Sequence, residues 1–418
     1  MNEKKDPARI LNISYIAAFL LMLAIPVVTM NFGRTDTSVT ENRKLAAFPS
    51  LKTAEGKINR NLPSDFEAWF NDHIGLRDPM IRANATLRMR LFGEMPAGAD
   101  YRLGPKGELN YVGQIVIPEY QHTNLLPEEK IAEICDAYTV VNDYLEGRGI
   151  RFYYMQNWDK QSVYPEYFPD TVIQYGDISM TDQVIDALMT RTSVPVISTK
   201  EAMIRGKEQY ETYSVWGNST HWTDRGAYLG YRQLMERIAE DYEGVLERKA
   251  EKDRSQSEEG GSGQNGEANA PNPQNNTLKI LSEEDYLIEK KDLGDTLFGG
   301  IHVENVSEAF TIKEPKAQTA NERLTLYRDL DPRQSYHVNP EAGNDLRLLI
   351  IGDSYIEMFL IDDISESFSE TIQLWSVTMF DLVKIVDEYR PDIVLYERAE
   401  REPGFEDVIR AAESIHEN

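Results

Sequence analysis

The feature that most constrains the fold is a short apolar run, residues 347–351, which ends abruptly in Gly352-Asp353-Ser354. A continuous apolar run of this length, closed by a turn signal, is typical of a buried strand in a parallel sheet. Ligands bind at the carboxyl ends of strands in open α/β sheets. Gly352 allows close backbone approach, and the Ser354 N–H is expected near a helix start, where negative charge is stabilised. The segment therefore predicts either a nucleophilic serine or an ordinary polar turn.

A candidate base for Ser354 lies upstream. The chain has six histidines, and His221 alone stands between a polar cluster, residues 216–220, and an evident helix start. Thr223 is expected to cap this helix, which continues with apolar residues at helical spacing from 227 to 238. A histidine just before a helix is positioned by its backbone and can act across a cleft as general base. The alternative is a structural histidine with satisfied hydrogen bonds.

The rest of the chain predicts one large α/β domain. Helices are expected at about 126–147, 180–190 and 380–389, and strands at 150–155, 194–197, 372–375 and 393–396. Alternating elements of these lengths imply a doubly wound parallel sheet with flanking helices, over residues 119–418. Two helices, at 66–74 and 81–91, are expected in a membrane-proximal stem, residues 35–118, that packs on the main domain. Residues 252–277 contain almost nothing to bury and predict a disordered insertion.

The N-terminal segment predicts a membrane anchor. Residues 10–30 are apolar and, at about 1.5 Å per residue, long enough to cross a bilayer. Lys4, Lys5 and Arg9 precede them, so the positive-inside rule places the N-terminus in the cytoplasm and everything after residue 34 outside the cell. No Ala-x-Ala-like site follows the run, which favours an uncleaved single-pass anchor over a cleaved signal peptide.

Charge and composition exclude several classes of partner. The chain carries 44 basic and 70 acidic residues, a net charge of −26. Phosphate binding needs a positive surface, so a nucleic-acid partner is not expected. The sequence contains neither a Cys/His metal cluster nor a phosphate-binding glycine loop, so no metal and no cofactor are expected. The one cysteine, Cys135, falls in a predicted helix and is expected in the core.

Taken in order, the motifs resemble a known family. His221-Trp222-Thr223 followed by a Gly-Ala helix, with Gly352-Asp353-Ser354 downstream, resembles the SGNH-like hydrolase domain of the alginate O-acetylation proteins AlgJ and AlgX. The pattern is most similar to their Gram-positive relatives, the DHHW family. Further matching pieces are Glu41–Leu45, Phe66–Arg77, Lys160 with Tyr164–Pro169, and Pro391–Arg398.

One position departs from the family pattern. The family's acid lies two residues before the histidine, where this chain has Ser219, preceded by Asn218. In serine proteases, replacing the carboxylate by an amide lowers turnover about ten-thousand-fold. Three alternatives follow. Ser219 or Asn218 orients His221 in a weak dyad, a remote carboxylate such as Asp224 or Asp353 substitutes, or the protein is a degenerate relative.

The resemblance implies a reaction and a set of partners. Ser354 would carry an acetyl group and His221 would act as general base, with Ser219 in the place of the acid. The acceptor would be a polysaccharide hydroxyl, and the acetyl donor a multi-span membrane O-acyltransferase. The sequence leaves open a carbohydrate acetylesterase, a secreted lipase or esterase, and a degenerate membrane-anchored glycan-binding or scaffolding protein of an exopolysaccharide system.

Four further residues are candidates for a glycan-binding groove. These residues are Lys160, Tyr164, Trp222 and Arg398. Lys160 and Arg398 could equally be surface ion-pair partners, and Trp222 a core residue.

Overall fold

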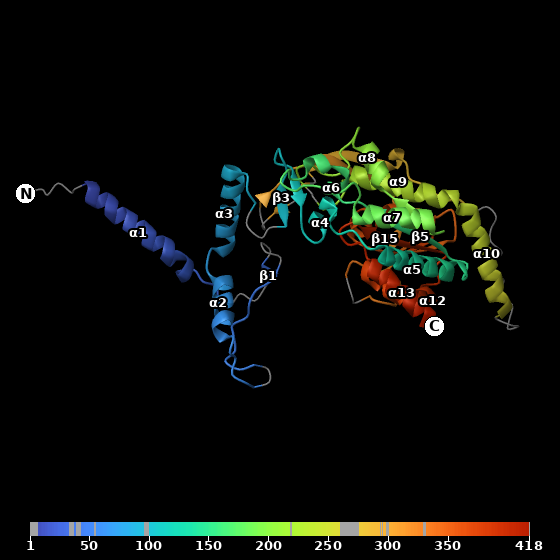
Figure 1. Cartoon of the computed structure of the whole chain (residues 1–418), viewed down its shortest axis with the longest axis horizontal. Coiled ribbons are helices and arrows are strands. Elements are labelled where there is room, and N and C mark those ends of the chain that lie inside the picture. The colour runs from blue at the N-terminus through green and yellow to red at the C-terminus, as the bar shows by residue number, and fades with distance from the viewer. Residues whose placement is uncertain are drawn as a thin grey trace, which may run out of the picture. The chain divides into compact units, whose positions relative to one another are not determined.

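The computed structural model describes residues 7–32, 37–38, 43–53, 56–95, 100–217, 220–259, 276–292, 294, 296–297, 301–328 and 332–417. The chain forms two compact units (Figure 1). The first comprises residues 1–99 and 295–303, and the second comprises residues 100–294 and 304–418. The predicted domain boundary at residue 118 falls inside the second unit.

The first unit consists of helices and short strand pairs. Its elements are α1 (Pro7–Val28), β1 (Thr37–Ser38), β2 (Arg43–Lys44), α2 (Leu62–His73), α3 (Arg77–Phe92), β8 (Thr296–Leu297) and β9 (Ile301–His302). Among the described residues, one helix segment is long and apolar enough to cross a membrane, Leu11–Val28, with a mean hydropathy of 2.2. Membrane anchors and signal sequences both contain segments of this length and hydropathy. The two helices predicted in the stem are present as α2 and α3, and Trp69 of α2 is buried against Phe48 and Phe66.

The second unit is built on a seven-stranded sheet in the order β11-β12-β14-β13-β15-β5-β6. These strands are β5 (Arg151–Asn157), β6 (Val196–Ser198), β11 (Gln318–Thr319), β12 (Ser335–Val338), β13 (Arg347–Gly352), β14 (Glu370–Trp375) and β15 (Ile393–Ala399). The strands from β14 to β6 are parallel, which confirms the predicted parallel sheet. The remaining two form an antiparallel edge, which the sequence did not predict.

Helices cover both faces of this sheet. On one face α5 (Glu128–Glu146) packs against α7 (Met180–Arg191) and α13 (Phe405–Glu417), and α13 packs against α12 (Leu382–Tyr389). On the other face α9 (Asp224–Glu240) packs against α8 (Lys200–Gly206) and the π-helix η4 (Ile356–Leu360). Figure 1 shows α5, α12 and α13 on one side of β5 and β15, and α8 and α9 on the other. The predicted SGNH-like α/β fold with flanking helices is confirmed.

Smaller elements complete the second unit. They are β3 (Tyr101–Leu103), β4 (Leu109–Tyr111), α4 (Val116–Gln121), α6 (Lys160–Val163), α10 (Tyr242–Glu259), β7 (Tyr286–Asp292), β10 (Val306–Ile312), α11 (Ile361–Ser365) and the 3-10 turns η1 (Pro165–Tyr167), η2 (Glu283–Asp285), η3 (Asn321–Arg323) and η5 (Ser376–Asp381). β7 and β10 form an antiparallel ribbon.

The predicted disordered insertion is wrong in its first part. Residues 252–259 continue helix α10, and the Lys252 ammonium donates to the carbonyl of Pro391 at 3.0 Å and pairs with the Asp392 carboxylate. At the other end, Thr277 N–H donates to the Gly343 carbonyl at 2.7 Å. Residues 260–275 lie outside the described residues.

Candidate active site

Ser354 lies at the carboxyl end of the central strand β13. The strand ends at Gly352, and Ser354 begins the helical turn that continues into η4. A Cβ at Gly352 would lie 2.9 Å from Ile356 Cγ1 and 3.1 Å from Glu397 Oε2, so the turn requires a glycine. The first N–H groups of a helix lack intrahelical partners, which places the Ser354 N–H where a developing oxyanion is stabilised. π-helical segments such as η4 are frequent at functional sites.

Asp353 locks this turn in place. Its carboxylate accepts hydrogen bonds from the backbone N–H of Tyr355 at 3.0 Å and of Ala399 at 2.7 Å. Its own N–H donates to Glu397 Oε2 at 3.0 Å. Both carboxylate oxygens of Asp353 are thus used to tie the serine turn to the end of β15.

His221 is held just before helix α9. Thr223 caps the helix as predicted, because its side chain accepts a hydrogen bond from Gly226 N–H at 3.2 Å. Trp222 is 1% exposed, and its ring contacts the Tyr355 ring at 4.8 Å. The His221 ring itself packs on Tyr355, with centroids 4.9 Å apart. These contacts fix the direction in which the imidazole points.

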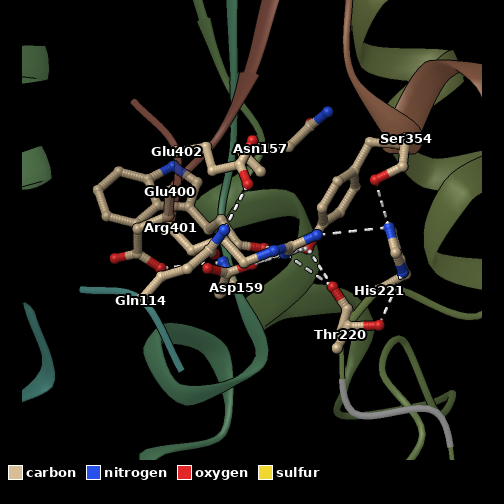
Figure 2. Close-up of polar contacts among 12 residues, drawn as sticks. Gln114, Asn157, Asp159, Thr220, His221, Ser354, Glu400, Arg401 and Glu402 are labelled. Atoms are coloured by element: carbon tan, nitrogen blue, oxygen red, sulfur yellow. Dashed lines mark hydrogen bonds and ion pairs between the residues drawn. The ribbon is translucent and has the colours of Figure 1, made fainter. Parts of the chain in front are cut away.

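The structure brings His221 and Ser354 together across the edge of the sheet. His221 Nε2 lies 2.7 Å from Ser354 Oγ, although the two residues are 133 positions apart (Figure 2). His221 Nδ1 lies 2.9 Å from the Thr220 hydroxyl. A nucleophile and base within hydrogen-bond reach, with a third group at the far nitrogen, is the arrangement that activates a serine. The spacing required by the sequence-based hypothesis is therefore present.

The residues expected to orient His221 in place of the family's acid do not contact its ring in the described part of the structure. Ser219 and Asn218 lie outside the described residues. Asp353 uses both oxygens in the serine turn, and Asp224 Oδ2 accepts from Phe310 N–H at 3.0 Å. The expectation that one of these two carboxylates orients His221 is wrong, because hydrogen bonds direct them elsewhere. Within the described part of the chain, the salt bridges and hydrogen bonds place no carboxylate on the His221 ring.

A buried ion pair beside the dyad was missed by the sequence analysis. Arg401 follows β15, and its guanidinium binds the Asp159 carboxylate and the Thr220 carbonyl, the latter at 2.8 Å. The other terminal nitrogen of Arg401 lies 3.4 Å from His221 Nε2 (Figure 2). Tyr355 O–H donates to Asp159 Oδ1 at 3.1 Å. One signal could have pointed to this pair: both charged residues directly follow strand ends at the ligand-binding edge.

Burial and Arg401 set the protonation state of the candidate base. Burial, with the Arg401 charge second, lowers the pKa of His221 from 6.5 to about 3. Burial raises the pKa of Asp159, and Arg401 and the Tyr355 hydroxyl oppose that rise. His221 is therefore neutral at physiological pH and able to accept a proton, although it is a weak base in the resting site.

All four predicted groove residues are buried. Lys160 is 2% exposed, and its ammonium donates to the carbonyls of Leu109 at 2.6 Å and Val215 at 3.0 Å. Arg398 is 5% exposed and donates through Nε to the Glu402 carbonyl.

Lys160 and Arg398 are therefore buried and do not lie on the surface, and Arg398 also pairs with the Glu402 carboxylate at 4.0 Å. Their groove role stays a prediction. Trp222 is a core residue, which was its alternative. Tyr164 borders a cavity of about 660 Å³ that Tyr167 and Trp216 also line.

A second cavity, of about 440 Å³, is lined by residues that follow His221 and Ser354 in the chain, but not by His221 or Ser354 themselves. Its lining residues come from the first turn of α9, from η4, from α11 and its C-terminal end, and from β10 and the chain just after it. Its apolar lining includes Phe359, whose ring packs on His221 with centroids 5.5 Å apart. Its polar lining is acidic and consists of Asp224, Asp362, Asp363 and Glu366. Carboxylates beside aromatic and apolar side chains suit a neutral polyhydroxy ligand, since carboxylates accept hydrogen bonds from hydroxyls.

The sequence of the second unit matches a known family over part of its length. Residues 119–303 match the family model described as SGNH hydrolase-like domain, acetyltransferase AlgX. The matched segment contains Asp159 and His221 and ends before Ser354. Comparison with curated protein sequences gives no significant match.

Several solved structures are similar to this chain. A DHHW family protein from Eubacterium siraeum is 14% identical with a TM-score of 0.44, over 77% of this chain and 99% of that one. The O-acetyltransferase domain of Pseudomonas putida AlgJ is 11% identical with a TM-score of 0.41, over 75% and 99%. Bacillus cereus PatB1 with a sulfonyl adduct is 14% identical with a TM-score of 0.43, over 66% and 90%. Similarity at this level carries no information on activity.

The family model thus confirms the resemblance that the motifs predicted, over the segment that holds His221. Residues 119–303 of this chain are similar to the SGNH hydrolase-like domain of acetyltransferase AlgX.

Proposed function

We propose that this protein is an acetyltransferase that moves an acetyl group onto a polysaccharide hydroxyl through an acetyl-Ser354 intermediate. The observation that carries the proposal is the 2.7 Å distance between His221 Nε2 and Ser354 Oγ at the carboxyl edge of the sheet. The match of residues 119–303 to an acetyltransferase domain supports acetyl as the group transferred.

The first half-reaction forms the acetyl-enzyme. Ser354 Oγ attacks the acetyl carbonyl carbon of the donor while its proton passes to His221 Nε2. The Ser354 N–H stabilises the oxyanion that forms on the carbonyl oxygen. When the tetrahedral intermediate collapses, the bond to the donor oxygen breaks, and the departing oxygen takes the proton from His221.

The second half-reaction reverses these roles. A sugar hydroxyl gives its proton to His221 Nε2 and attacks the acetyl carbon, and Ser354 leaves with that proton. Water in the place of the sugar would make the protein a carbohydrate acetylesterase instead. The acceptor chain occupies the 440 Å³ cavity, where Phe359 offers an apolar face and acidic side chains such as Asp362 accept hydrogen bonds from sugar hydroxyls. A polymer rich in carboxylates would be repelled there, so the acceptor is a neutral or amino-substituted glycan.

The proposal places the enzyme at the cell surface. Helix α1 anchors the chain in the membrane with its N-terminus in the cytoplasm, because Lys4, Lys5 and Arg9 precede the apolar run. The α/β unit then lies outside the cell, where polysaccharide is available. A multi-span membrane O-acyltransferase supplies the acetyl group, as the family resemblance implies.

The experiment tests for the acetyl-enzyme directly. The full chain in detergent is incubated with p-nitrophenyl acetate, and intact and peptide mass spectra are recorded. One acetyl group is expected on the peptide that contains Ser354, and none in Ser354→Ala. Ser255→Ala, which removes an exposed serine of α10, is the control and should retain the acetyl-enzyme. Adding neutral oligosaccharides should then transfer label to sugar, whereas release only as acetate indicates an esterase.

A catalytically inactive scaffold is the second candidate. The observation in its favour is Ser219 at the position of the family's acid. This alternative predicts no acetyl-enzyme and identical ester hydrolysis by the wild type and Ser354→Ala. Glycan binding would then persist in both proteins.

A further inference from the structure

We propose that the 660 Å³ cavity bordered by Tyr164 is a second saccharide subsite, which binds neutral or amino-substituted sugar units of the acceptor chain away from the unit that is acetylated. We call it the aromatic cavity, because Tyr167, Tyr210 and Trp216 also line it. Its effect on acetyl transfer rests on the proposed function, whereas saccharide binding itself does not.

The aromatic rings of this cavity are open to a ligand. Trp216 is 45% exposed and Tyr210 is 39% exposed, although both side chains are large and hydrophobic. Tyr167 is half-buried and stacks on buried Tyr164, with ring centroids 5.5 Å apart and 14° between the ring planes. A pyranose ring carries C–H groups on its faces and hydroxyls around its edge. Its faces therefore pack well on flat aromatic rings that also have a polar group at one end.

Polar side chains accompany these rings. Gln209 and Glu304 line the cavity and can form hydrogen bonds with hydroxyls at the edge of a sugar ring. The cavity volume falls within the range of about 300–1,000 Å³ that is typical of ligand sites. Aromatic rings combined with a few polar groups thus favour a sugar over a purely apolar ligand.

The charge of the lining narrows the class of sugar. Glu208, Glu211 and Glu304 line the cavity, and Lys207 is the one cation among its described lining residues. Lys207 pairs with Glu166 at 3.1 Å, so its charge is already compensated. A sugar that bears a carboxylate would be repelled, and an amino group would be attracted. The 440 Å³ cavity is acidic as well, so both cavities suit the same class of chain.

The backbone on both sides of Trp216 is held in place. The carbonyl of Val215 accepts a hydrogen bond from the Leu109 N–H at 3.2 Å. A Cβ at Gly217 would lie 2.6 Å from Asn305 Cβ, so the chain packs directly against the residue that precedes β10. A ring that is already positioned loses little conformational entropy when it binds a ligand.

The aromatic cavity and the 440 Å³ cavity are neighbours. The guanidinium carbon of Arg225 lies 4.3 Å from the centroid of Tyr210, which lines the first cavity, and 4.7 Å from that of Phe310, which lines the second. Strand β10 also contributes to both, through Val306 at its start and Phe310 four residues later. Four residues of a strand span roughly 13 Å. An oligosaccharide of several units can therefore reach both cavities, whereas a monosaccharide cannot.

The test reads binding at Trp216 without any chemistry. The full chain, which has five tryptophans, is labelled with 5-fluorotryptophan and studied by ¹⁹F NMR in a detergent that has no sugar head group. The Trp216 signal is assigned by its loss in Trp216→Phe. The probes are cellohexaose, which is neutral, a glucosamine hexamer and a mannuronate hexamer, which is anionic. The Trp216 signal should shift saturably with at least one of the first two hexamers and should not shift with the mannuronate hexamer.

Variants test whether the aromatic ring carries the affinity. By isothermal titration, Trp216→Ala should weaken binding of the hexamer that shifts the signal by about tenfold, and Trp216→Phe, which keeps an aromatic ring, by about threefold. The control is Tyr175→Ala, which removes a ring that is 69% exposed and does not line the cavity. This control should bind the hexamer as the wild type does.

Acetyl transfer supplies a second readout. Trp216→Ala should raise the KM for the hexamer acceptor about tenfold more than the KM for the corresponding monosaccharide, because the monosaccharide does not reach the aromatic cavity. A purely structural role for Trp216 would change both KM values by the same factor.

Three results would overturn the inference: no shift of the Trp216 signal with either uncharged or amino hexamer, equal binding of the mannuronate hexamer, or unchanged affinity in a folded Trp216→Ala. These results do not depend on acetyl transfer. If no acetyl-enzyme forms but hexamer binding still depends on Trp216, the proposed function fails and this inference stands.

Discussion

The buried imidazole of His221 should leave a measurable signature in the pH dependence of stability. Its pKa is about 3 in the folded protein and 6.5 ordinarily, because burial and Arg401 disfavour the charged form. Between these two values the unfolded state binds a proton that the folded state does not. Stability therefore falls as pH falls through 6.5 toward 3, and the contribution is constant above 6.5.

The magnitude follows from the size of this window. A pH of 4 is about 2.5 units below the pKa of the histidine in the unfolded chain. Each unit corresponds to about 1.4 kcal/mol of unfolding free energy. The folded histidine is still mostly neutral at pH 4. The wild type should thus lose about 3 kcal/mol between pH 7.5 and pH 4 because of this one group, and only 8% of His221 is exposed, so solvent screening is small.

The assay compares the wild type with His221→Gln by urea titration of the full chain in detergent. Fluorescence of the buried Trp158 and Trp222 reports on the α/β unit. Every other titrating group is common to both proteins, so the difference between their pH dependences isolates His221. Ser354→Ala retains the imidazole and should follow the wild type. If His221→Gln loses as much stability between pH 7.5 and pH 4 as the wild type does, to within 1 kcal/mol, the imidazole is not buried in its neutral form and the reasoning fails.

Three other perturbations test separate parts of the structure. Gly352→Ala should cost about 1–3 kcal/mol of unfolding free energy in urea, because its Cβ would lie 2.9 Å from Ile356 Cγ1; an unchanged midpoint would show that the turn relaxes. Burial raises the pKa of Asp363 to about 7, so its folded form keeps a proton that the unfolded chain releases, and stability is lost as pH rises from about 4 to 7. Over that range Asp363→Asn should gain roughly 3 kcal/mol on the wild type, and equal pH slopes would contradict this. Lys160→Met should lower the free energy of unfolding by about 3 kcal/mol with little effect on the KM for a glycan, whereas a KM effect alone would support its predicted groove role.

The elements that the sequence predicted correctly share one physical property. Each is buried on defined faces, and this burial leaves a regular spacing of apolar residues in the sequence. β13 is covered on both sides, so residues 348–351 are all fully buried and read as a continuous apolar run. Helix α9 carries its cap residue and its apolar face in the expected positions. The proximity of His221 and Ser354 was predictable for the same reason, since both residues adjoin such elements.

The features that were missed leave no comparable pattern. Helix α10 extends to residue 259 through a segment rich in Lys and Glu, which forms helix readily but has no apolar stripe. The ammonium of buried Lys160 donates to two main-chain carbonyls from distant parts of the chain, and the sequence contains no pattern that predicts these contacts. The chain after residue 396 alternates acidic and basic residues, so the sequence alone could not tell that Arg401, rather than Arg398, reaches the imidazole.

The position of Arg401 also shows how this site differs electrostatically from a complete triad. A carboxylate at Nδ1 both orients the imidazole and stabilises the imidazolium that forms when serine gives up its proton. Arg401 opposes the second of these effects, because its charge lies 3.4 Å from Nε2. As a consequence, His221 is a weaker base at neutral pH, but it stays neutral and able to accept a proton in acid.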